Sequence, residues 1–330
     1  MCTRKKIVSI IFSLVIILSV FVYVAPNSSW AAEKYPSRPI TLVVGYAPGG
    51  MADSLTRLWI PYFEKYLGVP VVIEHKAGGA GVLSCTHVAN AKPDGYTITS
   101  TGTVLFTAIL LGQATYSLPG DLRVVAQLQQ FTDGLAVRTD SPWKTFQEFM
   151  DYAKKNPGVV KYGNSGIGAT PHLRMAYLAK YAGLDIVPLP FRTGPDLINA
   201  ILGGHVPIGV YSVGSFKPLI DAGKLRLIFS FEPPAEFGFD PTISDFRTFF
   251  RSESPIDTPT YMVVPGKTPV EIVKVLEECA EKMTKEPGYL AELKKLYIRP
   301  NFIGSEAMQK ILPEKMAHFK EVLRDAGLIK

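Results

Sequence analysis

The sequence predicts an α/β protein built from two lobes, and three observations support this fold class. From Ile40 onward, short β-rich runs alternate with segments of helical periodicity, which predicts mostly parallel sheets covered by helices. The 330 residues exceed one doubly wound domain of ordinary size. Residues 232–259 are rich in proline and poor in periodic apolar positions, which indicates a long irregular connection. The composition, 47% apolar and 19% charged, excludes a disordered chain.

The β-rich runs are the expected strands, and helices are expected between them. The runs are Ile40–Tyr46, Val69–Glu74, Tyr96–Thr101, Arg123–Gln129, Val159–Gly163, Asp185–Leu189, Val206–Tyr211, Leu225–Phe231, Tyr261–Val264 and Arg299–Ile303. Two helix starts carry strong signals. Thr145-x-x-Glu148 and Thr268-Pro269-Val270-Glu271 both predict capping boxes, the second with proline at the first helical position.

These elements divide the chain into four parts. We expect a signal peptide at 1–31, the first part of lobe 1 at 32–134, lobe 2 at 135–253, and a return to lobe 1 with the C-terminal helices at 254–330. The first crossing between the lobes is expected near Gly134–Ser141, and the second within the proline-rich segment.

The N-terminus has the order of a secretory signal. Basic residues at 4–6 precede the uncharged apolar run Ile7–Ala25, and Ser29-Trp30-Ala31 offers a cleavage site after Ala31. Export is therefore predicted; the alternative is that the 19-residue run is retained as a membrane anchor. Cleavage lowers the formal charge from +6 to +3, and the remaining Lys and Arg are scattered, so nucleic acid is not an expected partner.

Three cysteines are too few for a disulfide scaffold or a cysteine-rich zinc module. Cys85 and Cys279 remain after cleavage of the signal. They could pair in an oxidising compartment, but two separate buried thiols are the favoured interpretation.

Two glycine-rich turns, each between a predicted strand and a helix, form the candidate binding site. The first is Ala47-Pro48-Gly49-Gly50-Met51-Ala52-Asp53, and the second runs from Gly163 to His172. Each places free backbone N–H groups and the positive end of a helix at the carboxyl edge of a sheet. If the lobes face each other, both helix ends converge on one anionic ligand. Ser165 and Thr170 add hydroxyls, and Asp53 can accept a hydrogen bond from a ligand or water; the alternative is a purely structural role for both turns.

No motif predicts catalysis, a metal or a cofactor. Gly163-Asn164-Ser165-Gly166-Ile167 has Ile where a nucleophile elbow requires a second glycine, and His172 lies in the same turn rather than later in the chain. The five histidines lack metal-ligand spacing, and no glycine loop has a dinucleotide or Walker pattern. An enzyme is therefore not expected, and a serine-hydrolase-like activity is kept only as a remote alternative.

An ordered set of short segments from Tyr35 to the C-terminus resembles a known family. The segments are Tyr35-Pro36-Ser37-Arg38-Pro39-Ile40, Pro48-Gly49-Gly50 with Asp53, Pro93-Asp94-Gly95-Tyr96-Thr97, Ser165-Gly166-x-Gly168 with His172-Leu173, Leu202-Gly203-Gly204, Ala222-Gly223-Lys224-Leu225-Arg226 and Ala326-Gly327. Individually these are weak, but in this order they resemble the extracytoplasmic solute receptors of tripartite tricarboxylate transporters, the Bug receptors.

The resemblance implies a type II periplasmic binding protein-like fold, with two α/β lobes closing on a small carboxylate. It places the ligand contacts in the two turns and in three segments that line the same cleft. The implied ligand-binding residues are Tyr46, Pro48, Gly49, Gly50, Asp53, Thr101, Thr103, Ser165, Gly168, Ala169, Thr170, His172, Phe191, Arg192 and Ser212. Two roles stay open: His172 either caps its loop or touches the ligand, and Arg192 either binds a carboxylate in bidentate fashion or is a charge at the cleft rim.

Several positions depart from the family pattern. Met51-Ala52 follows the double glycine, Ala169 replaces a usual serine, Tyr211 replaces a usual aspartate, and Phe191-Arg192 replaces Tyr-Lys. These changes predict a more apolar and aromatic distal pocket, and a ligand with a carboxylate head on an aromatic or alkyl body.

The resulting hypothesis is a periplasmic solute receptor without catalytic residues, metal or cofactor. It would act as a monomer that captures a small organic anion and delivers it to the membrane subunits of a tripartite tricarboxylate transporter. The first alternative is a sensor that presents the bound solute to a signalling partner, tethered to the membrane if Ile7–Ala25 is retained.

Overall fold

The computed structural model describes residues 34–251, 254 and 256–330. The chain divides into two compact units, residues 1–37 and 38–330. The described part of the first unit, residues 34–37, contains no helix or strand, and the predicted signal peptide lies outside the described residues. All the elements below belong to the second unit.

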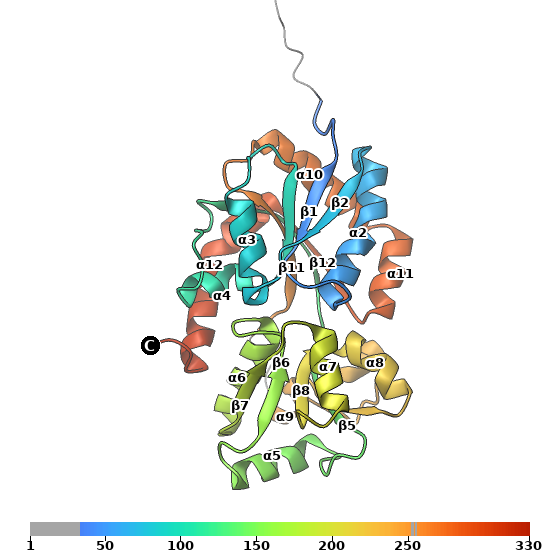
Figure 1. The fold of residues 1–330 in the computed structure, drawn as a ribbon, viewed down its shortest axis with the longest axis vertical. Coiled ribbons are helices and arrows are strands. Elements are labelled where there is room, and N and C mark those ends of the chain that lie inside the picture. The colour runs from blue at the N-terminus through green and yellow to red at the C-terminus, as the bar shows by residue number, and fades with distance from the viewer. Residues whose placement is uncertain (1–33, 252–253, 255) are drawn as a thin grey trace, which may run out of the picture. The chain divides into compact units, whose positions relative to one another are not determined.

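Two six-stranded sheets form the two lobes, which confirms the predicted two-lobed α/β architecture (Figure 1). The first sheet has the order β12-β4-β11-β3-β1-β2 and the second the order β10-β9-β5-β8-β6-β7. The strands of the first sheet are β1 (Ile40–Val44), β2 (Val71–His75), β3 (Thr97–Thr101), β4 (Leu122–Gln130), β11 (Pro259–Pro265) and β12 (Arg299–Gly304). Those of the second are β5 (Asp133–Arg138), β6 (Lys161–Asn164), β7 (Val187–Pro190), β8 (Ile208–Ser212), β9 (Leu225–Ser230) and β10 (Ser244–Asp245).

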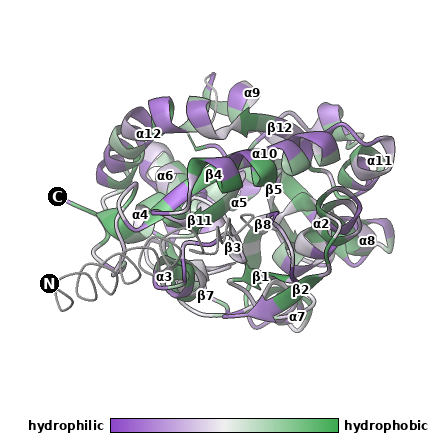
Figure 2. Ribbon diagram, turned by 90° about the horizontal axis from the view of Figure 1, so that it is seen from above, coloured by the Kyte–Doolittle hydropathy of each residue, from purple (hydrophilic) through white to green (hydrophobic). Residues whose placement is uncertain are grey.

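Helices surround both sheets, and each helix buries one of its faces against the rest of its lobe. With the first sheet go α2 (Met51–Leu67), the short η1 (Gly79–Gly81), α3 (Val82–Ala89), α4 (Val104–Leu110), α10 (Val270–Thr284), α11 (Pro287–Lys295) and α12 (Ser305–Asp325). With the second go α5 (Phe146–Lys155), α6 (Thr170–Ala182), α7 (Gly194–Leu202), α8 (Val213–Asp221), η2 (Pro234–Phe237) and α9 (Phe246–Phe250). Outer helices such as α12 alternate hydrophilic and hydrophobic residues in Figure 2, as expected for helices with one buried face.

The sheets are mixed, so the expectation of mostly parallel strands is wrong. The pairs β1·β2, β1·β3, β6·β7, β6·β8 and β9·β10 are parallel, but β3·β11, β4·β11, β4·β12, β5·β8 and β5·β9 are antiparallel. The antiparallel strands belong to the segments that carry the chain between the sheets. A strand that crosses directly has no crossover helix to return it to its starting edge, so it runs against its neighbours.

The change of sheet occurs within two residues. β4 ends at Gln130 and β5 begins at Asp133, so only Phe131 and Thr132 connect the sheets on the way out. The strand β5 was not among the expected strands, because it begins with Asp133 and Gly134, two residue types that are uncommon in strands. The chain returns through the segment before β11, whose Pro259 pairs with Gln130.

Local sequence signals had mixed outcomes. The capping box at Thr145 and Glu148 is present, which confirms the first of the two predicted helix starts. A helix also begins at the second site, but the capping box predicted there is wrong: α10 begins at Val270 with Pro269 as N-cap, and the Thr268 hydroxyl donates to the Pro265 carbonyl instead. The favoured interpretation of two separate buried thiols is confirmed, since Cys85 and Cys279 are both buried and free.

A close backbone approach joins the two lobes beside α8. A Cβ built on Gly214 would lie 2.2 Å from the carbonyl oxygen of Leu296, which follows α11 of the first lobe. Real Cβ atoms do not approach a carbonyl this closely, so only glycine lets α8 pack against this segment.

Gly214→Ala should therefore lower the free energy of unfolding by about 1–3 kcal/mol, because the added methyl overpacks a contact whose other side is backbone. Urea denaturation measures the change. Ser215→Ala, one residue further along the same helix, is the matched control and should stay within about 0.5 kcal/mol of wild type. Equal stability of Gly214→Ala and the control would contradict the close approach.

Candidate functional site

Two helix N-termini from different lobes meet at one cavity. α2 begins at Met51 after the turn that follows β1, and α6 begins at Thr170 after the turn that follows β6. Gly49 (φ 84°) and Gly168 (φ 83°) adopt the left-handed conformation just before these helices, which glycine reaches without steric cost. The predicted convergence of the two turns is thus present in the described chain.

The cavity encloses about 100 Å³. One water molecule occupies roughly 10–15 Å³ of such a cavity, so the space holds roughly seven to ten water-sized groups. Its walls come from both lobes and from the segments that cross between them. The lining residues are Tyr46, Ala47, Gly50, Met51, Ala52, Leu55, Ser100, Thr101, Gly102, Thr103, Val104, Phe131, Asp133, Ser165, Ala169, Thr170, Pro171, Arg192, Thr193, Gly194, Tyr211, Ser212, Thr258, Pro259 and Thr260.

The first turn is held in place by Asp53. Its carboxylate accepts hydrogen bonds from the Gly49 N–H (3.0 Å) and Arg57 Nε (3.1 Å), and it lies 2.8 Å from His75 Nε2. Burial opposes ionisation of Asp53, but these hydrogen bonds outweigh it and hold the pKa of the carboxyl below its usual value. Asp53 does not line the cavity; it positions the loop that does.

The second turn is held by His172. Its Nδ1 accepts a hydrogen bond from the Gly168 N–H at 3.3 Å, and the ring is buried. Burial lowers the pKa of His172 to about 4, so the ring is neutral at physiological pH. His172 does not line the cavity either, and this contact matches the loop-capping alternative.

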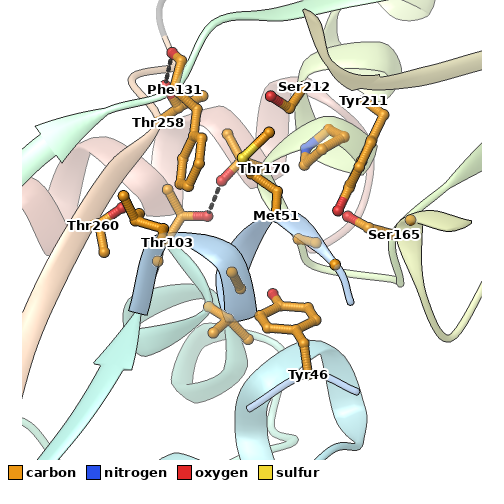
Figure 3. A pocket seen from close by; sticks show the side chains of 18 of the residues that line it. Tyr46, Met51, Thr103, Phe131, Ser165, Thr170, Tyr211, Ser212, Thr258 and Thr260 are labelled. Atoms are coloured by element: carbon orange, nitrogen blue, oxygen red, sulfur yellow. Dashed lines mark hydrogen bonds between the residues drawn. The ribbon is translucent and has the colours of Figure 1, made fainter. Parts of the chain in front are cut away.

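Hydroxyl groups connect the two lobes across the cavity. Thr103 Oγ1 lies 2.6 Å from Thr170 Oγ1, and Thr107 Oγ1 donates to the Gly168 carbonyl at 2.9 Å. In Figure 3 the side chains of Thr103 and Thr260 approach from the first lobe, and those of Tyr211, Ser212 and Ser165 from the second. The lobes are therefore in direct contact around the cavity.

A buried ionic cluster stands behind the second-lobe wall. Arg174 of α6 pairs with Glu232, and its Nη1 lies 3.7 Å from Asp133 Oδ2; all three side chains are almost fully buried. One guanidinium faces two carboxyl groups, so the cluster carries excess negative charge only when Asp133 is ionised. Burial, with the nearby Glu232 charge, outweighs the attraction of Arg174 and raises the pKa of Asp133 to about 7.

Of the residues implied by the resemblance, the cavity brings together nine. These are Tyr46, Gly50, Thr101, Thr103, Ser165, Ala169, Thr170, Arg192 and Ser212. Pro48, Gly49, Asp53, Gly168 and His172 belong to the two turns but do not line the cavity, and Phe191 lines an adjoining groove instead. Arg192 is exposed and lines both the cavity and the groove, as a rim charge does.

Sequence reasoning missed the wall supplied by the crossing segments. Phe131, Asp133, Thr258 and Thr260 reach the cavity only because the two crossings lie side by side. Nothing in their local sequence marks them as lining residues. The sequence did offer one signal for this wall, namely Tyr211, which stands in place of the aspartate that the family usually has before Ser212 and which lines the cavity.

Other kinds of site receive no support within residues 34–251, 254 and 256–330. This part of the chain contains no group of three or more His, Cys, Asp or Glu side chains that could hold a metal. It also has no helix with the length and hydropathy needed to cross a bilayer.

Comparisons with known proteins agree on one family. The family described as "Tripartite tricarboxylate transporter family receptor" matches residues 57–328. A Cupriavidus necator protein called "UPF0065 protein in gbd 5'region" is 32% identical over 301 residues, which cover 91% of this chain and 90% of that protein.

Solved structures share the fold. The periplasmic binding protein BugD has a TM-score of 0.80 and 25% identity, covering 89% of this chain and 99% of its own. A protein from R. palustris, Rpa4515 with adipate, has a TM-score of 0.82 and 22% identity, covering 89% and 98%. The expected periplasmic binding protein-like fold is confirmed.

Asp133→Asn should change how stability depends on pH. The folded-state pKa of about 7 lies above the ordinary value of 3.8, so ionisation of Asp133 lowers the free energy of unfolding as the pH rises between these values. The variant cannot ionise. It should therefore gain stability relative to wild type across this window, on the order of a few kcal/mol, and keep that advantage at higher pH.

Urea unfolding of both proteins between about pH 4 and pH 8 measures this difference. His172, with its pKa lowered to about 4 from 6.5, acts in the opposite direction, since it makes the fold more stable as the pH rises toward 6.5. The comparison cancels that contribution, which both proteins share. A stability difference independent of pH would contradict the raised pKa of Asp133.

Proposed function

Because the chain belongs to the family of tripartite tricarboxylate transporter receptors, we propose that it captures a small organic carboxylate between its lobes and delivers it to the membrane subunits of such a transporter. As a receptor of this family it is a solute-binding protein and not an enzyme. Receptors of the family are periplasmic. Cleavage of the signal after Ala31 is part of the proposal.

The observation that carries this proposal is the pair of helix N-termini at one cavity. The N-terminus of an α-helix offers unpaired N–H groups and a positive partial charge, which favour a carboxylate. In α6 the second helical residue is Pro171, which has no N–H, and the Thr170 hydroxyl adds a donor at the same end. A carboxylate placed here would touch both lobes.

Binding would couple to closure because each lobe supplies only half of the site. A ligand that bridges Met51–Ala52 and Ser165–Thr170 stabilises the closed arrangement by its differential affinity for it. Both halves come from a single chain, which supports action as a monomer. Rpa4515, a protein of the same fold, has bound adipate, so this fold accommodates a small carboxylate. The cavity volume favours ligands of this size or smaller.

The lining favours a ligand with an apolar body. Met51, Leu55, Phe131 and the rings of Tyr46 and Tyr211 surround the polar groups, in keeping with an alkyl or compact aromatic group on the carboxylate. A hydrolytic function has no support, since the His172 ring holds the Gly168 N–H. Family membership favours delivery to a transporter over presentation to a signalling partner.

Calorimetry against a panel of short carboxylates tests the proposal, and Thr170→Val sharpens it. This isosteric change removes the hydroxyl that lies 2.6 Å from Thr103. It should weaken carboxylate binding about fivefold, because one hydrogen bond contributes about 1 kcal/mol, and it should lower the thermal midpoint of the unliganded protein by only a few degrees. Thr86→Val, at an exposed threonine outside the cavity, is the matched control. Unchanged affinity in Thr170→Val would exclude this helix end from the site.

Arg192→Gln should affect association more than dissociation. The side chain is exposed at the boundary of cavity and groove, so we expect it to attract anions rather than grip them. Stopped-flow binding should show a slower association rate, with a difference that shrinks as salt is added, and a change in Kd well below tenfold. A tenfold or larger loss carried by the dissociation rate would instead indicate a bidentate carboxylate contact.

A further inference from the structure

One wall of the cavity carries two buried polar side chains, each with an oxygen that has no hydrogen-bond partner within the described chain. Asp133 of β5 is 3% exposed and Ser212 of β8 is 4% exposed, and both line the cavity. Among the described residues, neither Asp133 Oδ2 nor Ser212 Oγ has a hydrogen-bond partner. Buried polar atoms in native proteins are nearly always paired, so this wall lacks a partner that a ligand can supply.

The fold places these two side chains together. Asp133 and Ser212 are directly opposite each other in the antiparallel pairing of β5 with β8. Side chains in that relation have their Cβ atoms about 4.5–5.5 Å apart, so one small group can contact both. A carboxylate and a hydroxyl at this spacing form an acceptor site for a hydrogen-bond donor.

The charge around Asp133 favours a cationic donor. Arg174 is the cation beside it, and Arg174 is shared with Glu232 and with the Ile256 carbonyl. The backbone N–H of Asp133 is itself bound to Glu232. Burial, together with the charge of Glu232, raises the pKa of Asp133 to about 7, because the ionised carboxylate has no full counter-ion of its own in the cluster. A ligand ammonium would neutralise that charge, and a hydroxyl would satisfy the oxygen without neutralising it.

The two ends of the cavity thus have opposite character. Positive helix ends lie at Met51 and Thr170, and the negative wall lies at Asp133, all around one space of about 100 Å³. A second carboxylate directed at the ionised Asp133 would meet like charge in a buried setting, which is unfavourable. A compact ligand must therefore present different groups to the two ends.

We propose that Asp133, assisted by Ser212, selects carboxylates that carry a hydrogen-bond-donating substituent, with ammonium preferred over hydroxyl and unsubstituted acids bound least. This inference rests on the proposed function, because it takes the helix ends as the carboxylate site. Asp133 is then the residue that determines specificity, while the helix ends supply affinity common to all the ligands.

The experiment compares ligands that differ only in that substituent. Calorimetry on the purified chain uses two matched series, namely propionate, lactate and alanine, and succinate, malate and aspartate. Within a series that binds, we expect the amino compound to bind at least about tenfold more tightly than the unsubstituted acid, with the hydroxy compound between them.

Asp133→Asn supplies the second arm. The amide keeps the size and one acceptor but removes the charge, and it leaves Arg174 with a single counter-ion, Glu232, so the variant should fold. It should lose the advantage of the amino compound over the unsubstituted acid by about tenfold. Ser212→Ala should reduce the preference in the same sense. Asp151→Asn, on the exposed face of α5, is the matched control.

The outcomes separate the two proposals. Equal binding of substituted and unsubstituted acids, or an unchanged order of preference in Asp133→Asn, would overturn the role of Asp133 and leave the carboxylate receptor intact. If calorimetry detects no binding of any carboxylate in either series or in the wider panel, both the receptor proposal and this inference are overturned. Thermal unfolding of each variant confirms that the comparison is made on folded protein.

Discussion

The chain passes from one sheet to the other through only two residues, Phe131 and Thr132, and returns beside the same point before β11. This pair of adjacent crossings fixes where the two lobes can approach each other. It places the ends of β1 and β6 on facing edges, and each of these strands leads directly into a glycine turn and a helix. The cavity depends on that arrangement, because its lining residues come from both lobes and from the crossing segments.

The turns then depend on side chains that never reach the cavity. Asp53 holds the Gly49 N–H, and His172 holds the Gly168 N–H. Both are buried acceptors that fix a loop, so the N–H groups of the following helices are preorganised before any ligand arrives. The residues with the most obvious chemistry in the two turns therefore serve the backbone, and the ligand-facing surface is built from backbone, threonine and serine hydroxyls, and aromatic rings.

The electrostatic design of the site is two-sided. Helix ends give one region a positive character, and the Arg174, Glu232 and Asp133 cluster gives another region a negative one. A buried cluster with uneven charge costs stability, and it persists here at the wall of a cavity rather than in a packed core.

The sequence by itself determined the strand–turn–helix units, the family and the non-enzymatic character, because each depends on residues adjacent in the chain. Gly49, Gly50 and Gly168 with their flanking strands predict both helix ends, and nine of the implied ligand residues lie on the cavity. Only the tertiary structure decided which side chains complete the wall. Asp133 faces Ser212 through strand pairing between distant segments, and Thr258 and Thr260 arrive with the returning chain. The hydrophobic periodicity of a single segment does not predict such pairings, because the register between distant strands is set by the packing of the whole sheet.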